Sequence, residues 1–415
     1  MAHPKLTILK SDSLPWEDRA ARVLGVASLP PLPTPRDEEW QATNLRPLMA
    51  LPPHRDADWE LASVAKALPV VQGPQLVLVN GRVVPQLSLL EGLHGISMLT
   101  DTSPSLPSHD ALDVYNNHQG GQMASVTVEG TASTLHVIHV LAGNEVPTGG
   151  SLWVNIYPNS SLTLIEHVVS TPAAAGWMND QTHIHVAEHS TLHHVVIQNV
   201  SSHSVVTRKQ HVDVASTATY TAFTLHTGGT LARLETHLNA HAASHVAITG
   251  LSLTDAAQTH DTTLRIRHHD VGTQTRIRHR SILRGSTAHA VFQGKFYVAQ
   301  KAQKTNANML AESLLLADGA RARVKPELEI YADDVICSHG ASTGSLNPDQ
   351  VFYMAARGIP ETEAKRLLVS AFAEAVLDDV PAPAHSLVAA HVNAWLDGPT
   401  PAPDADAEPD TDWLS

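Results

Sequence analysis

Short runs of β-branched and aliphatic residues fill the chain from about Met123 to about Ile336. Most are three or four residues long, and residues typical of turns separate them. The clearest runs are 126–128, 162–165, 183–186, 195–197, 246–248 and 264–267, with turn residues at 143–144, 158–160, 228–229 and 318–319. No convincing amphipathic helix of crossover length interrupts the series. The pattern therefore predicts an all-β segment and excludes a doubly wound α/β fold.

Two all-β architectures fit this segment: a sandwich or barrel, and a solenoid of stacked coils. A series of short strands this long, without a helix, is buried more easily by stacking coils than by one sandwich. The repeat is too degenerate in sequence to prove a solenoid, so the pattern alone leaves both architectures open.

The first hundred or so residues are predicted to be helical and mixed. Ser13 is a candidate helix N-cap, Pro15 stands near the first turn, and Gly25 follows the last helical residue. The apolar stripe between them consists of Trp16, Ala20, Val23 and Leu24. A second helix is predicted from Asp56 to Leu68, and the pair Asn80-Gly81 between two β-prone runs predicts a hairpin.

After Pro348 the pattern returns to helix. Apolar residues at helical spacing predict a helix from Glu361 to Leu377, and a second helix is predicted from Ser386 to Leu396, with Gly398 as its stop. The apolar stripe of the first helix is Ala364, Leu367, Leu368, Ala371, Phe372, Ala375 and Val376. The remaining residues are rich in Pro, Asp and Glu and predict a disordered acidic tail. The expected domains are 1–110 (N-terminal, helical and mixed), 111–344 (β core), 345–398 (C-terminal, helical) and 399–415 (tail).

Charge and composition narrow the range of partners. No run of eighteen apolar residues is present, and Met1 to Lys5 lead into no signal-like apolar segment, so we expect a cytoplasmic protein without a membrane span. With 27 Lys and Arg against 41 Asp and Glu, the formal net charge is −14. This excess of acid disfavours nucleic-acid binding. One basic stretch remains, formed by Arg265, Arg267, Arg276, Arg278, Arg280 and Arg284; a solvated sheet face is favoured for it, and a phosphate or partner site is the alternative.

The single cysteine, Cys337, and His339 are the candidate metal-binding residues. If the extended state continues through Val335 to His339, the two side chains point the same way. Thiolate and imidazole both bind iron in iron–sulfur centres, where four protein ligands are the rule, so one chain with one cysteine cannot complete such a site. From residue types alone, the favoured interpretation of Cys337 is a small buried residue.

The other histidines form four pairs that invite a metal interpretation: 136 and 139, 183 and 185, 193 and 194, and 268 and 269. None has the spacing of a known third ligand, and histidine as an ordinary polar strand residue is favoured. No nucleotide-binding GxxxxGK[ST] segment and no GxSxG segment is present.

Several long segments, in order, resemble the SufB/SufD family of iron–sulfur cluster assembly proteins. The strongest are 299–307, 314–316, 325–335, 337–341 and the pairs Phe352-Tyr353 and Arg357-Gly358, with weaker matches at 38–40, 79–82 and 291–295. The SufD branch is indicated by Gly340, because SufB proteins usually have glutamate there, and by the cysteine two residues before the histidine. Ile336 departs from the lysine often found in this branch, which puts in doubt a positive charge beside the thiol.

The resemblance implies a right-handed parallel β-helix core flanked by N-terminal and C-terminal helical regions. It also implies a non-catalytic scaffold that pairs with a SufB-like subunit through the β-helix and with a SufC-like ABC-type ATPase through the C-terminal helices. Cys337 and His339 are then expected to contribute to a nascent cluster, or to iron entry, at the SufB-like interface. No tightly bound cofactor is expected in the isolated chain, and a reduced flavin in the whole complex is left open.

Two rival functions predict different features. A polysaccharide-active β-helix enzyme needs clustered acids and aromatic platforms, yet aromatic residues make up only 4% of the chain. A stand-alone histidine-rich metal store predicts that the isolated chain binds several metal ions tightly.

Overall fold

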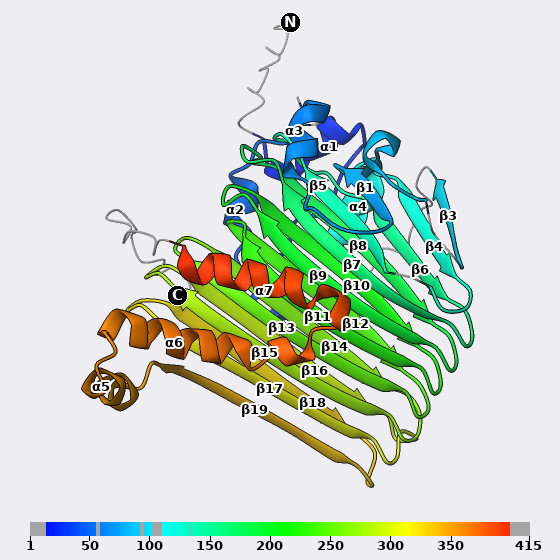
Figure 1. Cartoon of the computed structure of the whole chain (residues 1–415). Helices are drawn as coiled ribbons and strands as arrows, with labels where there is room; N and C mark the ends of the chain where they lie inside the picture. The colour runs from blue at the N-terminus through cyan, green and yellow to red at the C-terminus, as the bar shows by residue number, and fades with distance from the viewer. Residues whose placement is uncertain (1–13, 55–58, 92–94, 102–109, 133, 399–415) are drawn as a thin grey trace, which may run out of the picture.

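A computed structural model describes residues 14–54, 59–91, 95–101, 110–132 and 134–398. The described chain is dominated by two long sheets between which it alternates, strand by strand (Figure 1). The ten-stranded sheet contains β1 (Gln75–Val79), β2 (Arg82–Val83), β5 (Leu135–Leu141), β7 (Ser161–Ser170), β9 (Thr191–Val200), β11 (Thr219–Gly228), β13 (His245–Asp255), β15 (Gln274–Arg284), β17 (Asn306–Leu315) and β19 (Ile336–Ser345). The nine-stranded sheet contains β3 (Ile96–Asp101), β4 (Met123–Val128), β6 (Ser151–Ile156), β8 (Trp177–Val186), β10 (Val205–Val214), β12 (Leu231–Ala240), β14 (Thr259–His268), β16 (His289–Val298) and β18 (Arg321–Ile330).

Neighbouring strands from β4 onward are parallel and come from successive coils, so the core is a parallel β-helix. Val205 pairs with Leu231 and His289 with Arg321, which gives coil lengths of 26 and 32 residues at the two extremes. This variation is why the repeat is not visible in the sequence. Of the two architectures that the pattern left open, the solenoid is therefore the one found.

The interior between the two sheets is filled by every second strand residue. At one end of the strands these residues are aliphatic or aromatic, for example Leu162, Tyr220, Phe292 and Phe296, all fully buried. Burial of this apolar column, at about 25 cal/mol per Å², is what holds the coils together.

The N-terminal region adds helices and the first strands. Its helices are α1 (Trp16–Leu24), η2 (Glu38–Trp40), α2 (Arg46–Met49), α3 (Leu61–Ala67), η3 (Pro85–Leu87) and α4 (Ala111–His118). Gly25 ends α1 in the left-handed conformation, as predicted, whereas the Ser13 cap lies outside the described residues. The helix predicted from Asp56 begins only at Leu61, because Glu60 is extended; residues 55–58 are not described.

The Asn80-Gly81 hairpin prediction is confirmed. Asn80 and Gly81 have φ of 49° and 73°, the conformation of a tight primed turn, and they connect β1 to β2. β1 also pairs with β5 and β3 with β4, so the segment predicted as an N-terminal domain supplies strands to both sheets. At the other end, β19 runs one residue beyond the predicted core boundary.

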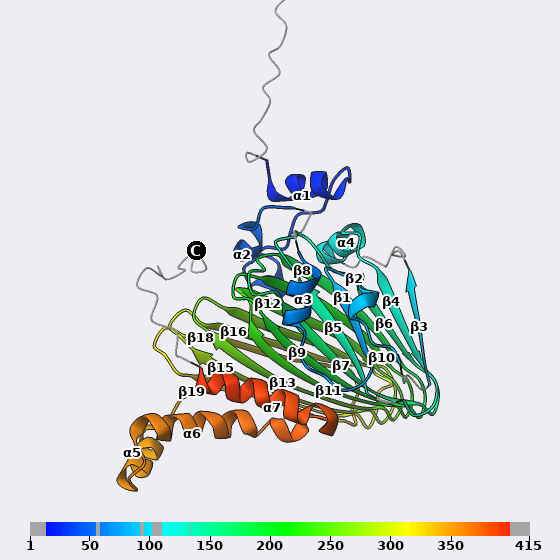
Figure 2. The ribbon, with the colours of Figure 1, turned by 45° about the horizontal axis from the view of Figure 1, so that its top comes forward.

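Three helices follow the solenoid: α5 (Pro348–Ala356), α6 (Glu361–Glu374) and α7 (Ala382–Asp397), with the short η4 (Leu377–Asp379) between the last two. The helix predicted to Leu377 thus ends at Glu374. The helix predicted from Ser386 begins four residues earlier, at Ala382, since Pro383 fits its first turn. Both lie across the outer face of the ten-stranded sheet, while α5 projects beyond it (Figure 1 and Figure 2). The predicted acidic tail, 399–415, lies outside the described residues.

In the described parts of the chain, no helix combines the length and the apolar character that crossing a membrane requires.

Candidate functional site

Cys337 and His339 lie at the start of β19, the last strand of the ten-stranded sheet. In the ladder with β17, Cys337 stands opposite Ala307 and His339 opposite Met309. Ala307 and Met309 belong to the interior core, so both candidate side chains face the interior side of the sheet. The predicted shared face is therefore present.

The two side chains differ in their surroundings. Cys337 is half-buried and packs against a small apolar cluster of Val298, Ala302 and Ala332, whereas His339 is exposed. Burial raises the pKa of the Cys337 thiol, and a backbone hydrogen bond from Ala307 acts in the opposite direction. Burial therefore favours the protonated form of the thiol.

The end of the solenoid at which Cys337 lies is open. β19 and β18 are the terminal strands of their sheets, and each has one edge without a strand partner among the described residues. Apolar side chains are exposed here: Ile336 is 68% exposed, Tyr331 55% and Ile330 37%. Unpaired edges of this kind are templates for pairing with another chain.

No set of three or more His, Cys, Asp or Glu side chains within the described residues is arranged to hold a metal ion. Cys337 and His339 therefore have no third side chain of these types placed with them in the part of the chain that the structure describes.

The arginines of β15 correct the favoured sequence interpretation of a solvated face, because Arg278, Arg280 and Arg284 are covered by the C-terminal helices. Arg276 stays largely exposed. Arg278 donates to the Ala375 carbonyl at 2.8 Å, and Arg284 donates to the Trp395 carbonyl at 2.8 Å. Arg280 donates to the Phe372 carbonyl at 2.5 Å, and its guanidinium lies 4.4 Å from the centre of the Phe372 ring.

These contacts place cations at the C-terminal ends of α6 and α7, where unsatisfied carbonyls and the helix dipole favour them. Asp379, just after α6, adds ion pairs of 2.8 and 2.9 Å to Arg276 and Arg278. Below the arginines, an apolar layer that includes Phe223, Leu251 and Val388 joins helices to sheet. The two helices are therefore firmly attached to the β-helix.

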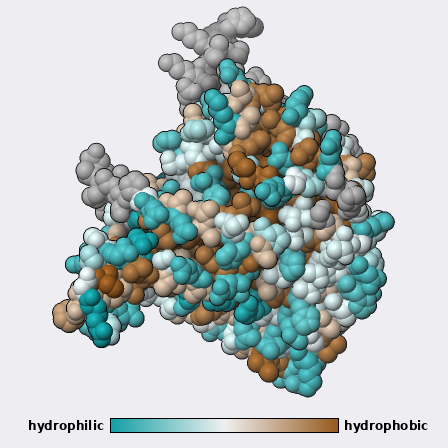
Figure 3. Space-filling view, viewed as in Figure 1, coloured by the Kyte–Doolittle hydropathy of each residue, from teal (hydrophilic) through white to brown (hydrophobic). Residues whose placement is uncertain are grey.

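α5 is attached differently. It has no buried residue and, of the other elements, packs mainly against α6, while Phe352 is 76% exposed and Tyr353 60%. Apolar surface gathers at this projecting end (Figure 3).

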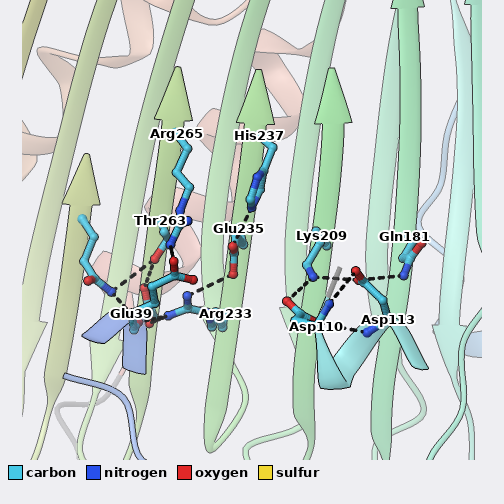
Figure 4. A network of polar contacts seen from close by, with 12 residues as sticks. Glu39, Asp110, Asp113, Gln181, Lys209, Arg233, Glu235, His237, Thr263 and Arg265 are labelled. Carbon is cyan, nitrogen blue, oxygen red and sulfur yellow. Dashed lines mark hydrogen bonds and ion pairs between the residues drawn. The ribbon is translucent and has the colours of Figure 1, made fainter. Parts of the chain in front are cut away.

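A polar network fixes the N-terminal segment to the outer face of the nine-stranded sheet (Figure 4). Arg233, fully buried, forms ion pairs with Glu235 and Asp261, donates to the Glu39 carbonyl, and lies 4.0 Å from the centre of the Trp40 ring. Arg265, from the predicted basic stretch, is paired with Glu39. The weak family match at 38–40 thus corresponds to a docking contact of the N-terminal segment.

A second contact of the same kind lies beside it in Figure 4. Lys209 of β10 is ion-paired with Asp110 and Asp113 of the α4 cap, at 2.7 Å from the latter. Gln181 donates to the same Asp113 carboxylate at 3.0 Å. These ties explain why the short helix α4 keeps its place on β8.

An ionic cluster is buried inside the solenoid. Glu166 binds His139 at 2.8 Å, His194 at 2.7 Å and Arg208 at 2.5 Å, and His139 also contacts Asp180 at 3.1 Å. Burial acts to lower the pKa of His139, but its hydrogen bonds to Asp180 and Glu166 outweigh this and raise it. With both ring nitrogens against carboxylates, the protonated form of His139 is favoured, and His139 and Arg208 then balance the charges of Glu166 and Asp180.

Further histidines of the described strands lie on both faces of the two sheets. On the outside, His183 stacks on Trp153 at 4.4 Å and on His211 at 5.0 Å between ring centres. On the inside, burial lowers the pKa of His260 to about 4 and of His279 to about 3. Histidine as an ordinary strand residue describes the outer ones; the sequence did not indicate that others form a buried column.

A family model described as "SUF system FeS cluster assembly, SufBD core domain" matches residues 139–372. An iron–sulfur cluster assembly SufBD family protein of Synechocystis sp. is 29% identical, with 84% of each chain covered. The iron–sulfur cluster assembly protein SufD of Escherichia coli is 31% identical over 82% of this chain and 84% of its own. A chloroplastic protein of Arabidopsis thaliana, ABCI7, is 34% identical over 49% of this chain and 43% of its own.

Proposed function

Because the chain belongs to the SufBD family of the SUF iron–sulfur cluster assembly system, we propose that it is a SufD-like scaffold subunit that builds clusters together with a SufB-like partner. The observation that supports this most is the position of Cys337 and His339 on the interior face of β19, beside an open sheet edge. The cluster is the cargo of such a site, and this chain supplies part of its ligand set.

The chemistry follows from the ligand count. A thiolate and an imidazole suit iron, but a cluster takes four protein ligands and this chain has one cysteine. The SufB-like subunit supplies the rest, and the cluster forms where the two chains meet. The raised pKa of the Cys337 thiol keeps it protonated and less reactive before iron arrives.

Pairing with the SufB-like subunit uses the open end of the solenoid. The unpaired edges of β18 and β19 offer main-chain hydrogen bonds, and the exposed Tyr331 and Ile336 offer apolar area. A second β-helix that stacks on this end continues both sheets and encloses Cys337 between the two chains.

Docking of a SufC-like ABC-type ATPase is proposed for α5 and the outward face of α6. The docking surface expected on the C-terminal helices therefore does not include the apolar stripe of α6, because Val369 and Ala373 are packed on the solenoid. Phe352 and Tyr353 of α5, by contrast, are exposed. ATP-driven movement of the ATPase pair then reaches the solenoid through α6 and α7. The β15 arginines that hold both helix ends support this transfer.

The proposed role needs no bond-making side chain, so the subunit acts by holding ligands in place rather than as an enzyme. Its compartment in this proposal is the reducing cytoplasm, where Cys337 stays a thiol. Whether a reduced flavin joins the complex is a separate question that the proposal does not require.

The proposal is tested by anaerobic reconstitution with iron and sulfide. The isolated chain should hold no stable cluster, whereas the chain co-purified with its SufB-like and SufC-like partners should hold one. A stoichiometric, chelator-resistant cluster on the monomeric chain alone would refute the shared site. Such a cluster would favour a self-sufficient metal protein.

A further inference from the structure

β19, the strand that carries Cys337, has little to hold it in place. It is an edge strand, paired on one side with β17, and most of its side chains are exposed. Strands of this kind open locally far more easily than the core. The position of Cys337 therefore depends on how the chain enters β19.

The chain enters β19 through a turn that stacks on the turn before β17. The turn before β17 contains Gln303 and Lys304, and the turn before β19 contains Asp334. The Gln303 side-chain oxygen accepts a hydrogen bond from the Asp334 N–H at 2.9 Å, and the Lys304 N–H donates to the Asp334 carbonyl at 2.6 Å. Asp334 thus has both of its main-chain groups tied to the turn below.

Each of these two hydrogen bonds is favoured by a neighbouring interaction or by the local backbone conformation. Gln303 is oriented by its amide group, which donates to the Gln300 carbonyl at 2.7 Å. Lys304 has a φ of 63°, which turns its N–H toward Asp334. The Lys304 ammonium also pairs with the Asp334 carboxylate, but both are about two-thirds exposed, so this ion pair contributes little.

The turn stack and Cys337 belong to one packing unit. Val298, Ala302 and Ala332 form a small buried cluster against which Val335 and Cys337 pack. Directly after the stack, the Ile336 N–H donates to the Thr305 carbonyl at 2.9 Å and begins the ladder. Only two residues separate Asp334 from Cys337, too few for a shift at Asp334 to be absorbed before the thiol.

We propose that Gln303 and the left-handed turn at Lys304 are positioning residues for Cys337, which hold the thiol half-buried on the interior face of β19. They act through the main chain of Asp334 and touch no metal. The consequence for cluster assembly rests on the proposed function, but the positioning itself is a property of the isolated chain. Gln303 and Lys304 belong to the segment 299–307, one of those that carry the family resemblance, and this positioning role explains why the two residues are found there.

Cys337 is the single cysteine, so its alkylation by iodoacetamide in the native full-length chain reports this position without background. Gln303→Ala should raise the alkylation rate about 3- to 10-fold, the range expected for one lost hydrogen bond. Gln303→Glu keeps an acceptor oxygen for the Asp334 N–H but loses the amide donor to the Gln300 carbonyl, so it should restore only part of the protection. Gln300→Ala is the matched control, because Gln300 contributes its main-chain carbonyl to the stack and should react like the original chain.

Lys304 gives an independent pair of variants. Lys304→Gly tolerates the positive φ and should leave alkylation unchanged, whereas Lys304→Val strains that conformation and should speed it.

The proposal is overturned if Gln303→Ala and Lys304→Val are alkylated at the original rate, or if Gln300→Ala reacts as fast as Gln303→Ala. Its failure is distinct from failure of the proposed function. Altered alkylation with normal cluster assembly in the complex keeps the positioning role and removes the ligand role of Cys337. Unaltered alkylation removes the positioning role whatever the complex does.

Discussion

Acidification should destabilise this protein through histidines buried inside the solenoid. His260 and His279 are fully buried, and burial lowers their pKa to about 4 and about 3. In the unfolded chain they titrate near 6.5. Below that pH the unfolded state binds protons that the folded state does not, so stability is complete above about pH 6.5 and is lost as the pH falls toward 4.

The size of the effect follows from the same values. Each pH unit below 6.5 costs about 1.4 kcal/mol per histidine, so acidification from pH 7.5 to 5.0 should cost about 2 kcal/mol for each of His260 and His279. Neither side chain is hydrogen-bonded to a carboxylate in the described structure: His260 binds the Gly228 carbonyl and Thr254, and His279 stacks on Phe292.

The assay compares urea unfolding at pH 7.5 and 5.0 for the original chain and for His279→Gln, which removes the proton site with little change in volume. The loss of stability between the two pH values should be about 2 kcal/mol smaller in His279→Gln. His245→Gln, on the exposed surface, should lose as much as the original chain. An equal loss in His279→Gln and the original chain would refute the reasoning that a buried neutral imidazole carries this cost.

Other side chains give further tests. Phe352→Asp and Tyr353→Asp should abolish co-purification of the SufC-like ATPase while leaving the SufB-like subunit bound, since both are exposed on α5; retention of the ATPase by both variants would count against this surface. Arg233→Met should lower stability by about 3–5 kcal/mol in urea unfolding, because it leaves buried carboxylates without their cation. Arg276→Met, at a side chain 58% exposed, should cost less than about 1 kcal/mol, and equal losses in the two would contradict the buried-pair argument.

Alternation along strands made part of the site predictable. Because side chains two residues apart share a face, the spacing of Cys337 and His339 was enough to place them together. Short β-branched runs likewise predicted the strands. The coil repeat stayed hidden since its length varies from 26 to 32 residues, so no fixed period marks it.

What covers a face could not be predicted in this way. Alternation put Arg278 and Arg280 on one face of β15, but the carbonyls that they bind, Ala375 and Phe372, lie about a hundred residues away. The cluster around Glu166 was equally unpredictable, because its partners His139, His194 and Arg208 come from other strands. A charged residue in a strand normally points to solvent, and only the partners brought by other coils make its burial tolerable.

The measurement that tests the central claim most directly is cluster assembly by the complex that carries Cys337→Ser. The substitution keeps the volume of the side chain but replaces a soft thiolate with a hard, weakly acidic hydroxyl. The account predicts that Cys337→Ser and His339→Ala complexes co-purify normally but form much less cluster, and that cells carrying them lose iron–sulfur enzyme activity under iron limitation. Normal cluster content and normal enzyme activity in both variants would contradict it, and would leave this chain a purely architectural role.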